Sequence, residues 1–235
     1  MHYEATYRRS IGQPEEFWAE AARAIDWKVA PQRILEYDQP PFRRWFAGGT
    51  TNLCHNAVDR HLEARGEQLA LVAVSTETGT TREITYRELH REVNAFAAVL
   101  RRLDVGRGDR VVIYMPNMAE AVFAMLACAR IGAVHSVVFG GFAAHNLALR
   151  IDDAQPKLLI AADAGSRGGR VIPYKPLVDE ACAKAAAPPP KVLIVSRGLD
   201  PALPRVEGRD EDYARLRAEV GEAQVPVEWL ESNEP

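Results

Sequence analysis

Hydrophobic positions recur with two different periods along most of the chain. From about residue 51 onward, short apolar runs predict strands at 69–74, 82–85, 110–115, 133–138, 157–162 and 191–195. Apolar residues three or four positions apart predict helices at about 52–65, 85–100, 119–131, 143–153, 177–187 and 213–220. Strands that alternate with helices are typical of βαβ units. The pattern therefore predicts an α/β fold in which alternating βαβ units form a mainly parallel, doubly wound sheet.

The first fifty residues have a different pattern. Residues 14–25 have apolar side chains three or four positions apart, as an amphipathic helix does, and Pro14 lies in the first turn. A proline-containing stretch without clear periodicity follows and ends in a turn at 45–49. We expect residues 1–50 to form an N-terminal helix and an extended arm, pinned onto a larger body by buried rings such as Trp45.

Composition narrows the protein class. The chain has 235 residues, of which 47% are hydrophobic and 26% charged, with a net charge of −3, and this balance excludes global disorder. No run of 18 apolar residues is present, and the N-terminus lacks the apolar core of a signal peptide. We therefore expect no membrane segment and a cytoplasmic protein.

Charge and cysteine content argue against nucleic-acid binding, disulfide bonds and a metal site. The last 36 residues carry four arginines and ten acids, while the remainder is only mildly basic, which is too weak for a nucleic-acid surface. The three cysteines form no CxxC pair, so neither a disulfide framework nor a metal site is predicted. Cys54 and Cys128 are interpreted as small buried hydrophobic residues.

Two predicted strand ends carry residues suited to binding an anion. Phe139, Gly140 and Gly141 follow one strand and precede a helix, whose free N-terminal amides favour negative charge. Glycines there let the backbone turn sharply or let a ligand come close. A plain turn that needs positive φ angles explains the same residues, so both interpretations stay open.

The second segment, 163–170, reads as a flexible loop after the strand at 157–162. Arg167 and Arg170 bracket Gly168 and Gly169. Guanidinium groups bind phosphate oxygens in pairs, and glycines keep side chains out of the way of a bulky ligand. A solvated loop with arginines that serve solubility is the alternative.

Motifs that would identify catalysis are absent. The sequence contains no GxxxxGK[ST], GxGxxG, HExxH or GxSxG pattern, and no catalytic residue set is predicted. The residues alone thus indicate an anion-binding α/β domain.

An ordered series of segments gives more detail. The chain resembles the N-terminal part of short-chain acyl-CoA synthetases, the acetyl-CoA and propionyl-CoA synthetase branch of the adenylate-forming enzymes. The segments that carry the resemblance are 7–11, 14–18, 45–49, 52–61, 84–89, 108–116 and 127–142. Within the branch, 165–170 and 173–181 look more like propionyl-CoA synthetases.

The resemblance implies a function and a division of the chain. Such enzymes join a small carboxylic acid, here propionate or acetate, to ATP with Mg²⁺, and then transfer the acyl group to coenzyme A (CoA). The resemblance places Arg167 to Arg170 on the CoA phosphates, and Phe139, Gly140 and Gly141 beside its nucleotide. It implies that residues 51–235 are the first part of the large N-terminal AMP-binding (adenylation) domain.

The resemblance also implies that functional parts lie outside these residues. The phosphate loop of the family is expected just beyond 231–235, and the catalytic lysine further on, in a C-terminal part of the same chain. We therefore expect a truncated piece that is inactive alone. A stand-alone module that binds CoA or a nucleotide without catalysis is the alternative.

Overall fold

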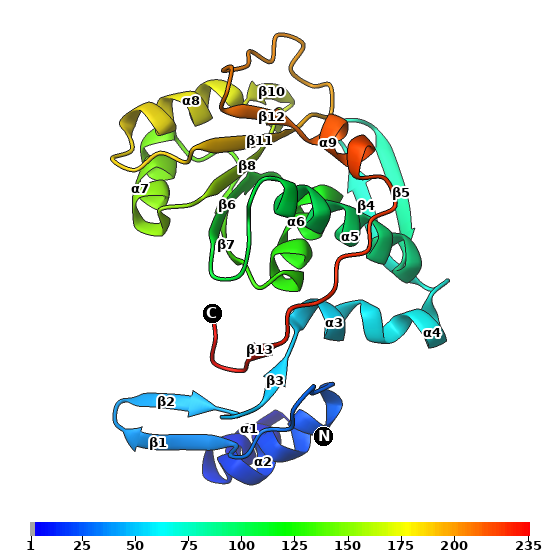
Figure 1. The fold of residues 1–235 in the computed structure, drawn as a ribbon, viewed down its shortest axis with the longest axis vertical. Coiled ribbons are helices and arrows are strands. Elements are labelled where there is room, and N and C mark those ends of the chain that lie inside the picture. Colours follow the sequence, from blue (N-terminus) through cyan, green and yellow to red (C-terminus); the bar gives the residue numbers. More distant parts are fainter. Residues whose placement is uncertain (1–2) are drawn as a thin grey trace.

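A five-stranded sheet forms the centre of the protein. The computed structural model describes residues 3–235 (Figure 1). The sheet order is β12-β11-β8-β6-β7, and every neighbouring pair is parallel. Its strands are β6 (Arg110–Met115), β7 (Val134–Phe139), β8 (Leu158–Ala162), β11 (Lys191–Val195) and β12 (Asp210–Asp212). The predicted α/β fold with a mainly parallel sheet is confirmed.

Two groups of helices cover the sheet. One group, in which α5 contacts the other two, consists of α5 (Tyr86–Arg102), α6 (Ala119–Arg130) and α9 (Tyr213–Val220). The other group is α7 (Ala144–Ala154) and α8 (Lys175–Lys184) (Figure 1). The N-terminus of α5 has the capping box that its sequence predicts, since Thr85 and Glu88 exchange hydrogen bonds.

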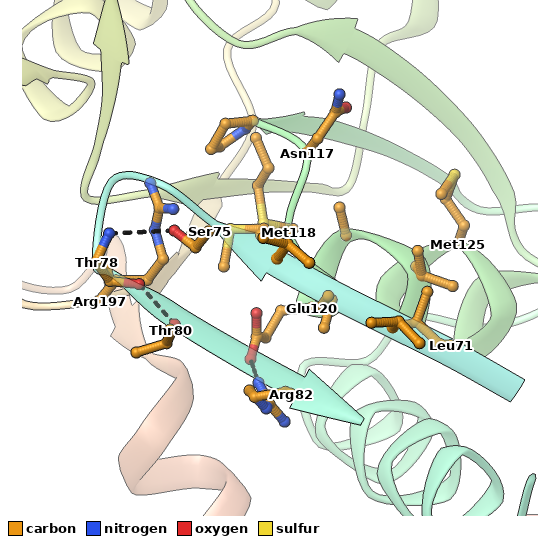
Figure 2. A pocket seen from close by; sticks show the side chains of 18 of the residues that line it. Leu71, Ser75, Thr78, Thr80, Arg82, Asn117, Met118, Glu120, Met125 and Arg197 are labelled. Atoms are coloured by element: carbon orange, nitrogen blue, oxygen red, sulfur yellow. Dashed lines mark hydrogen bonds and ion pairs between the residues drawn. The ribbon is translucent and has the colours of Figure 1, made fainter. Parts of the chain in front are cut away.

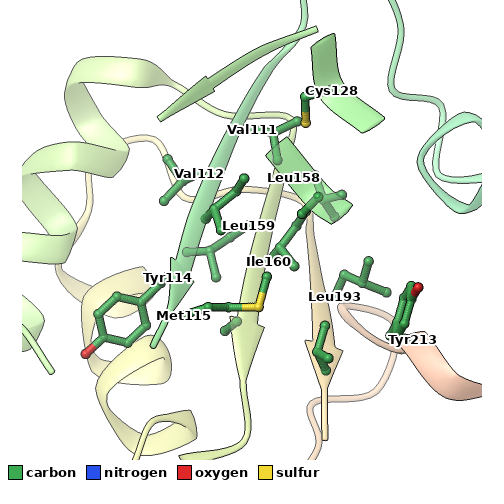
Figure 3. Packing of buried hydrophobic residues seen from close by; sticks show 14 of the residues in the cluster. Val111, Val112, Tyr114, Met115, Cys128, Leu158, Leu159, Ile160, Leu193 and Tyr213 are labelled. Atoms are coloured by element: carbon green, nitrogen blue, oxygen red, sulfur yellow. The ribbon is translucent and has the colours of Figure 1, made fainter. Parts of the chain in front are cut away.

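The core lies on both faces of the central strands. Every residue of β8 is fully buried, as is each of Val111 to Tyr114 in β6 (Figure 3). Continuous apolar runs are typical of strands covered on both faces, because no side chain then reaches water. Cys54 and Cys128 are buried, as predicted, and burial raises the pKa of the Cys128 thiol to about 12.

The first fifty residues contain more structure than the sequence predicts. Helix α1 (Tyr3–Gly12) precedes α2 (Pro14–Ala21), which continues as a 3₁₀ turn at Ala22–Ala24. Helix α1 buries none of its residues, so it lacks the apolar stripe by which helices are found. The prediction of an irregular stretch after α2 is confirmed for residues 25–34, where the only assigned pairing is one isolated bridge at Val29. It is wrong for residues 35–45, because β1 (Leu35–Gln39) and β2 (Phe42–Trp45) form an antiparallel hairpin with Pro40 and Pro41 in its turn.

The aromatic rings of this region contact one another. Trp18 packs edge-on against Trp45 at 5.9 Å between ring centroids, and Trp18 remains 38% exposed. Trp45 is half-buried and its ring contacts Trp18 and Phe46 of the same region, so the prediction that buried rings pin the arm to a larger body is not confirmed. The connection is made by backbone pairing, since β13 (Leu230–Glu231) pairs with β3 (Thr50–Thr51), and by Ser232, whose hydroxyl donates to the Trp45 carbonyl at 2.9 Å.

Smaller elements complete the fold. In place of the single helix predicted at 52–65, two short helices, α3 (Leu53–Ala57) and α4 (Leu62–Arg65), flank a 3₁₀ turn. Strands β4 (Leu69–Ser75) and β5 (Thr80–Thr85) form an antiparallel hairpin beside α6 (Figure 1). A third hairpin, β9 (Ala164–Arg167) with β10 (Arg170–Pro173), follows β8.

Candidate functional site

The two predicted anion-binding segments lie at the same edge of the sheet. Strand β6 leads through α6 to β7 on one side, whereas β8 leads through the β9–β10 hairpin and α8 to β11 on the other. Connections that diverge from neighbouring strands leave a crevice at the carboxyl ends of those strands, where α/β proteins bind ligands. The segments that follow β6, β7, β8 and β11 all begin at this edge.

The segment with the paired arginines is a β-hairpin, and its interpretation as a flexible loop is wrong. Four residue pairs join β9 to β10, and Arg167 pairs directly with Arg170. Gly168 and Gly169 form the turn with φ angles of +58° and +76°. Two-residue hairpin turns favour positive φ at both positions, because that twist matches the twist of the strands. The glycines therefore shape the hairpin that carries the arginines, which we call the arginine hairpin (residues 164–173).

The arginine side chains are available to a ligand. Arg167 and Arg170 are both exposed. Within residues 3–235, neither guanidinium group forms a hydrogen bond or ion pair with another side chain. Like charges placed opposite each other across a hairpin repel. An anion bound between these two groups would remove the repulsion and gain paired hydrogen bonds.

The glycine segment after β7 is held by Tyr114 of β6. The Tyr114 hydroxyl donates to the Phe142 carbonyl at 2.9 Å and accepts from the Gly141 amide at 3.2 Å. Burial raises the pKa of the Tyr114 phenol to about 12, so the hydroxyl keeps the proton that it donates. Phe139 is 69% exposed, and its ring lies 5.7 Å from that of Phe142. An exposed aromatic pair therefore stands at the end of β7.

Tyr174, at the start of α8, brings the two segments together. A Cβ placed on Gly140 would lie 2.8 Å from the Tyr174 hydroxyl, and one placed on Gly165 would lie 2.2 Å from it. Tyr174 is 3% exposed, and its ring packs 5.0 Å from that of Tyr114. Tyr174 lies in the segment 173–181 that carries part of the family resemblance, and no role is predicted for it from the sequence. The glycines at these positions leave room for a buried tyrosine between the turn and the arginine hairpin.

This packing makes a prediction for Gly165. The Gly165→Ala variant is expected to lose about 1–3 kcal/mol of stability, because its methyl group would overlap the buried Tyr174 ring. Urea unfolding of the purified protein measures the loss. Gly12→Ala is the matched control, since no atom lies within 4 Å of a Cβ at that position. Equal stabilities of the two variants would contradict the packing role of Tyr174.

A cavity of about 600 Å³ lies next to this edge, between the β4–β5 hairpin and α6 (Figure 2). Apolar side chains such as Leu71, Met118 and Met125 line much of it, and Arg197 lies at one end. None of the seven predicted site residues lines this cavity. The predicted residues therefore lie outside this cavity, which is lined by side chains that no sequence motif identified.

The described residues provide no metal centre. Across residues 3–235, no three His, Cys, Asp or Glu side chains are grouped closely enough to hold a metal ion. In the same range, no helix has both the length and the apolar character that crossing a membrane demands.

Comparisons with known proteins establish the family. The family model for AMP-binding enzymes matches residues 58–234. The chain belongs to the AMP-binding enzyme family. The family model for the acetyl-coenzyme A synthetase N-terminus matches residues 3–57. The resemblance to short-chain acyl-CoA synthetases is therefore confirmed.

Several relatives of this chain are much longer proteins. It is 58% identical over 234 residues to propionate–CoA ligase of Escherichia coli (strain K12), covering 100% of this chain and 37% of that protein. It is 43% identical over 240 residues to acetyl-coenzyme A synthetase of Bradyrhizobium diazoefficiens, covering 99% and 36%. Acetoacetyl-CoA synthetase from Streptomyces lividans has a similar structure, with a TM-score of 0.87, 27% identity and coverage of 100% and 35%. The chain thus spans just over one third of these relatives.

Proposed function

We propose that this chain is the N-terminal part of an ATP-dependent propionate–CoA or acetate–CoA ligase. In the first half-reaction the carboxylate attacks the α-phosphorus of ATP, forming an acyl-adenylate and releasing pyrophosphate. In the second, the CoA thiol attacks the acyl carbon, forming a thioester and releasing AMP and a proton. The supporting comparison is the identity of 58% over 234 residues with a propionate–CoA ligase.

Within that enzyme, we assign residues 1–50 to an N-terminal arm and residues 51–235 to the first part of the adenylation domain. The described residues contribute the CoA nucleotide site. Arg167 and Arg170 bind the phosphates, and the main support is that both guanidinium groups are exposed and unpaired with other described side chains. Gly168 and Gly169 form the turn between them, and Phe139 offers an exposed ring beside Gly140 and Gly141.

The proposal assigns no catalytic residue to positions 1–235. ATP, with the Mg²⁺ that accompanies its phosphates, and the carboxylic acid bind in the remaining part of the longer protein. That part would supply the groups that stabilise the pentavalent phosphorus, without which adenylation does not proceed. A cytoplasmic location belongs to the same proposal.

A pair of assays tests the function. The complete gene product is expected to form propionyl-CoA or acetyl-CoA with ATP consumption, while residues 1–235 alone are expected to release no pyrophosphate above background. Sequencing the reading frame beyond Pro235 provides an independent check, because a Ser/Thr/Gly-rich phosphate loop should follow. A frame that ends at Pro235 would instead favour a stand-alone binding module, and pyrophosphate release by residues 1–235 would contradict the division of function.

A further inference from the structure

The arginine hairpin has little stability of its own. It consists of four residue pairs, and at its tip two arginines with the same charge lie opposite each other. An isolated two-stranded hairpin is marginally stable in water, and opposed like charges weaken it further. Groups outside the hairpin must therefore hold it in the shape that presents both guanidinium groups to one ligand.

Two charged side chains occupy the outer edge of β9. The Ser166 amide, one residue before Arg167, donates to one carboxylate oxygen of Glu77. The Ala164 carbonyl, on the same edge, accepts from the guanidinium group of Arg197. In a strand, the carbonyl of one residue and the amide of the residue two positions later point to the same side. Glu77 and Arg197 thus satisfy the backbone groups that a neighbouring strand would otherwise satisfy.

Glu77 and Arg197 also bind each other. The second carboxylate oxygen of Glu77 accepts from Arg197, and the two side chains are only 17% and 12% exposed. The buried carboxylate of Asp163 lies 4.0 Å from Arg197 Nε, so a second negative charge attracts the same guanidinium group. Partial burial strengthens such attraction, because little water screens it. The ion pair is therefore a fixed support rather than a mobile surface contact.

The support reaches the arginine hairpin from two other parts of the fold. Glu77 lies in the turn of the β4–β5 hairpin, and Arg197 follows β11. Figure 2 shows the Arg197 side chain at the end of the β4–β5 hairpin, beside Ser75 and Thr78, which flank Glu77. Burial, and then the charge of Glu77, raise the pKa of Tyr174, in keeping with a carboxylate close to that ring. Segments distant in sequence thus meet behind the two arginines.

We propose that Glu77 and Arg197 are positioning residues, which hold the arginine hairpin in the conformation that binds the phosphates of CoA. This inference rests on the proposed function and extends it. Neither residue touches the ligand; both act through the backbone of β9. Without the ion pair, Arg167 and Arg170 are still present, but the hairpin can adopt conformations in which their guanidinium groups no longer face the same ligand.

The test uses the complete gene product and its two half-reactions. Glu77→Ala removes both the ion pair and the acceptor for Ser166, and the KM for CoA is expected to rise about tenfold. Glu77→Gln keeps an acceptor oxygen without the charge, and its KM is expected to rise about threefold. Isotope exchange between ATP and pyrophosphate without CoA should proceed at the wild-type rate in both variants. A matched control is Arg82→Gln, which breaks the 2.6 Å ion pair between Arg82 and Glu120 at the same hairpin and should leave the KM for CoA unchanged.

Pantetheine separates positioning from general damage. It carries the reactive thiol of CoA but no phosphates, so the kcat/KM of the Glu77 variants for pantetheine should equal that of the wild type. An unchanged KM for CoA, or an equal loss with CoA and pantetheine, would overturn the positioning role. A wild-type protein that forms no acyl-CoA would overturn the proposed function and this inference with it. An active wild type whose Glu77 variants behave normally would overturn the inference alone.

Discussion

Replacing both arginines of the hairpin, Arg167→Ala with Arg170→Ala, is expected to lower kcat/KM for CoA about 100-fold or more. Each guanidinium group that binds a phosphate contributes about 1.5–3 kcal/mol, and the structure shows no other described side chain that engages either one. Adenylate formation should be spared, because the hairpin belongs to the CoA step. Isotope exchange between ATP and pyrophosphate measures the first half-reaction, and thioester formation at varied CoA concentration measures the second.

Arg150→Ala is the matched control for this variant. Arg150 is an exposed arginine on α7, so its loss changes the net charge without altering the arginine hairpin. Its KM for CoA should stay at the wild-type value, which excludes a general electrostatic effect. If the double variant instead lost both half-reactions equally, the arginines would have a structural role, and the assignment of the CoA phosphates would be wrong.

Most of the central sheet could be predicted because its sequence signal is local. Strands β6, β8 and β11 are apolar runs, and the helices between them have apolar stripes. Buried positions can therefore be recognised from the residue types alone. Helix α1 buries no residue, so its sequence lacks the apolar stripe that would predict a helix. The β1–β2 hairpin is not predicted because prolines indicate irregular structure, although in the fold Pro40 and Pro41 occupy its turn.

The candidate site was found only in part, for a different physical reason. Arg167 and Arg170 could be predicted because two arginines around a glycine pair suit phosphate binding, and they are neighbours in the sequence itself. Tyr174, Glu77 and Arg197 act through contacts with residues far away in the chain, and none has a local pattern that reveals its partner. Gly165 shows the difference, since its small size is explained only by a tyrosine ring from the next helix.

Replacing Arg130 of α6 is expected to have a large effect on the stability of the fold. Its side chain is 5% exposed and forms an ion pair with Asp59. One guanidinium nitrogen lies 3.0 and 2.9 Å from the two Asp59 oxygens, and the Nε donates to the Val225 carbonyl. The Arg130→Met variant removes the arginine partner of a partly buried carboxylate and leaves it only the longer contact with His90, so the free energy of unfolding should fall by about 3 kcal/mol. Urea unfolding at neutral pH measures this loss.

The same pair makes stability depend on pH. Burial alone would raise the pKa of Asp59, but hydrogen bonds with His90 and Arg130 outweigh it and lower the pKa to about 2. Because this pKa lies below the usual aspartate value of 3.8, the ionised carboxyl stabilises the folded state above about pH 4. That contribution, about 2 kcal/mol, is lost as the pH falls from about 4 to 2. Asp59→Asn should lack this part of the acid dependence.

A double-mutant cycle decides whether Arg130 and Asp59 act together. The variant with both Arg130→Met and Asp59→Asn should be more stable than the sum of the single losses predicts, by at least about 1 kcal/mol, because neither charge is then left alone. Lys157→Met is the control, since its ion pair with Asp109 is 40% and 29% exposed and should contribute less than about 1 kcal/mol. Additive losses at Arg130 and Asp59 would show that the charges are not coupled. The stabilisation would then come from the bond between Arg130 and the Val225 carbonyl, which ties α6 to the C-terminal segment.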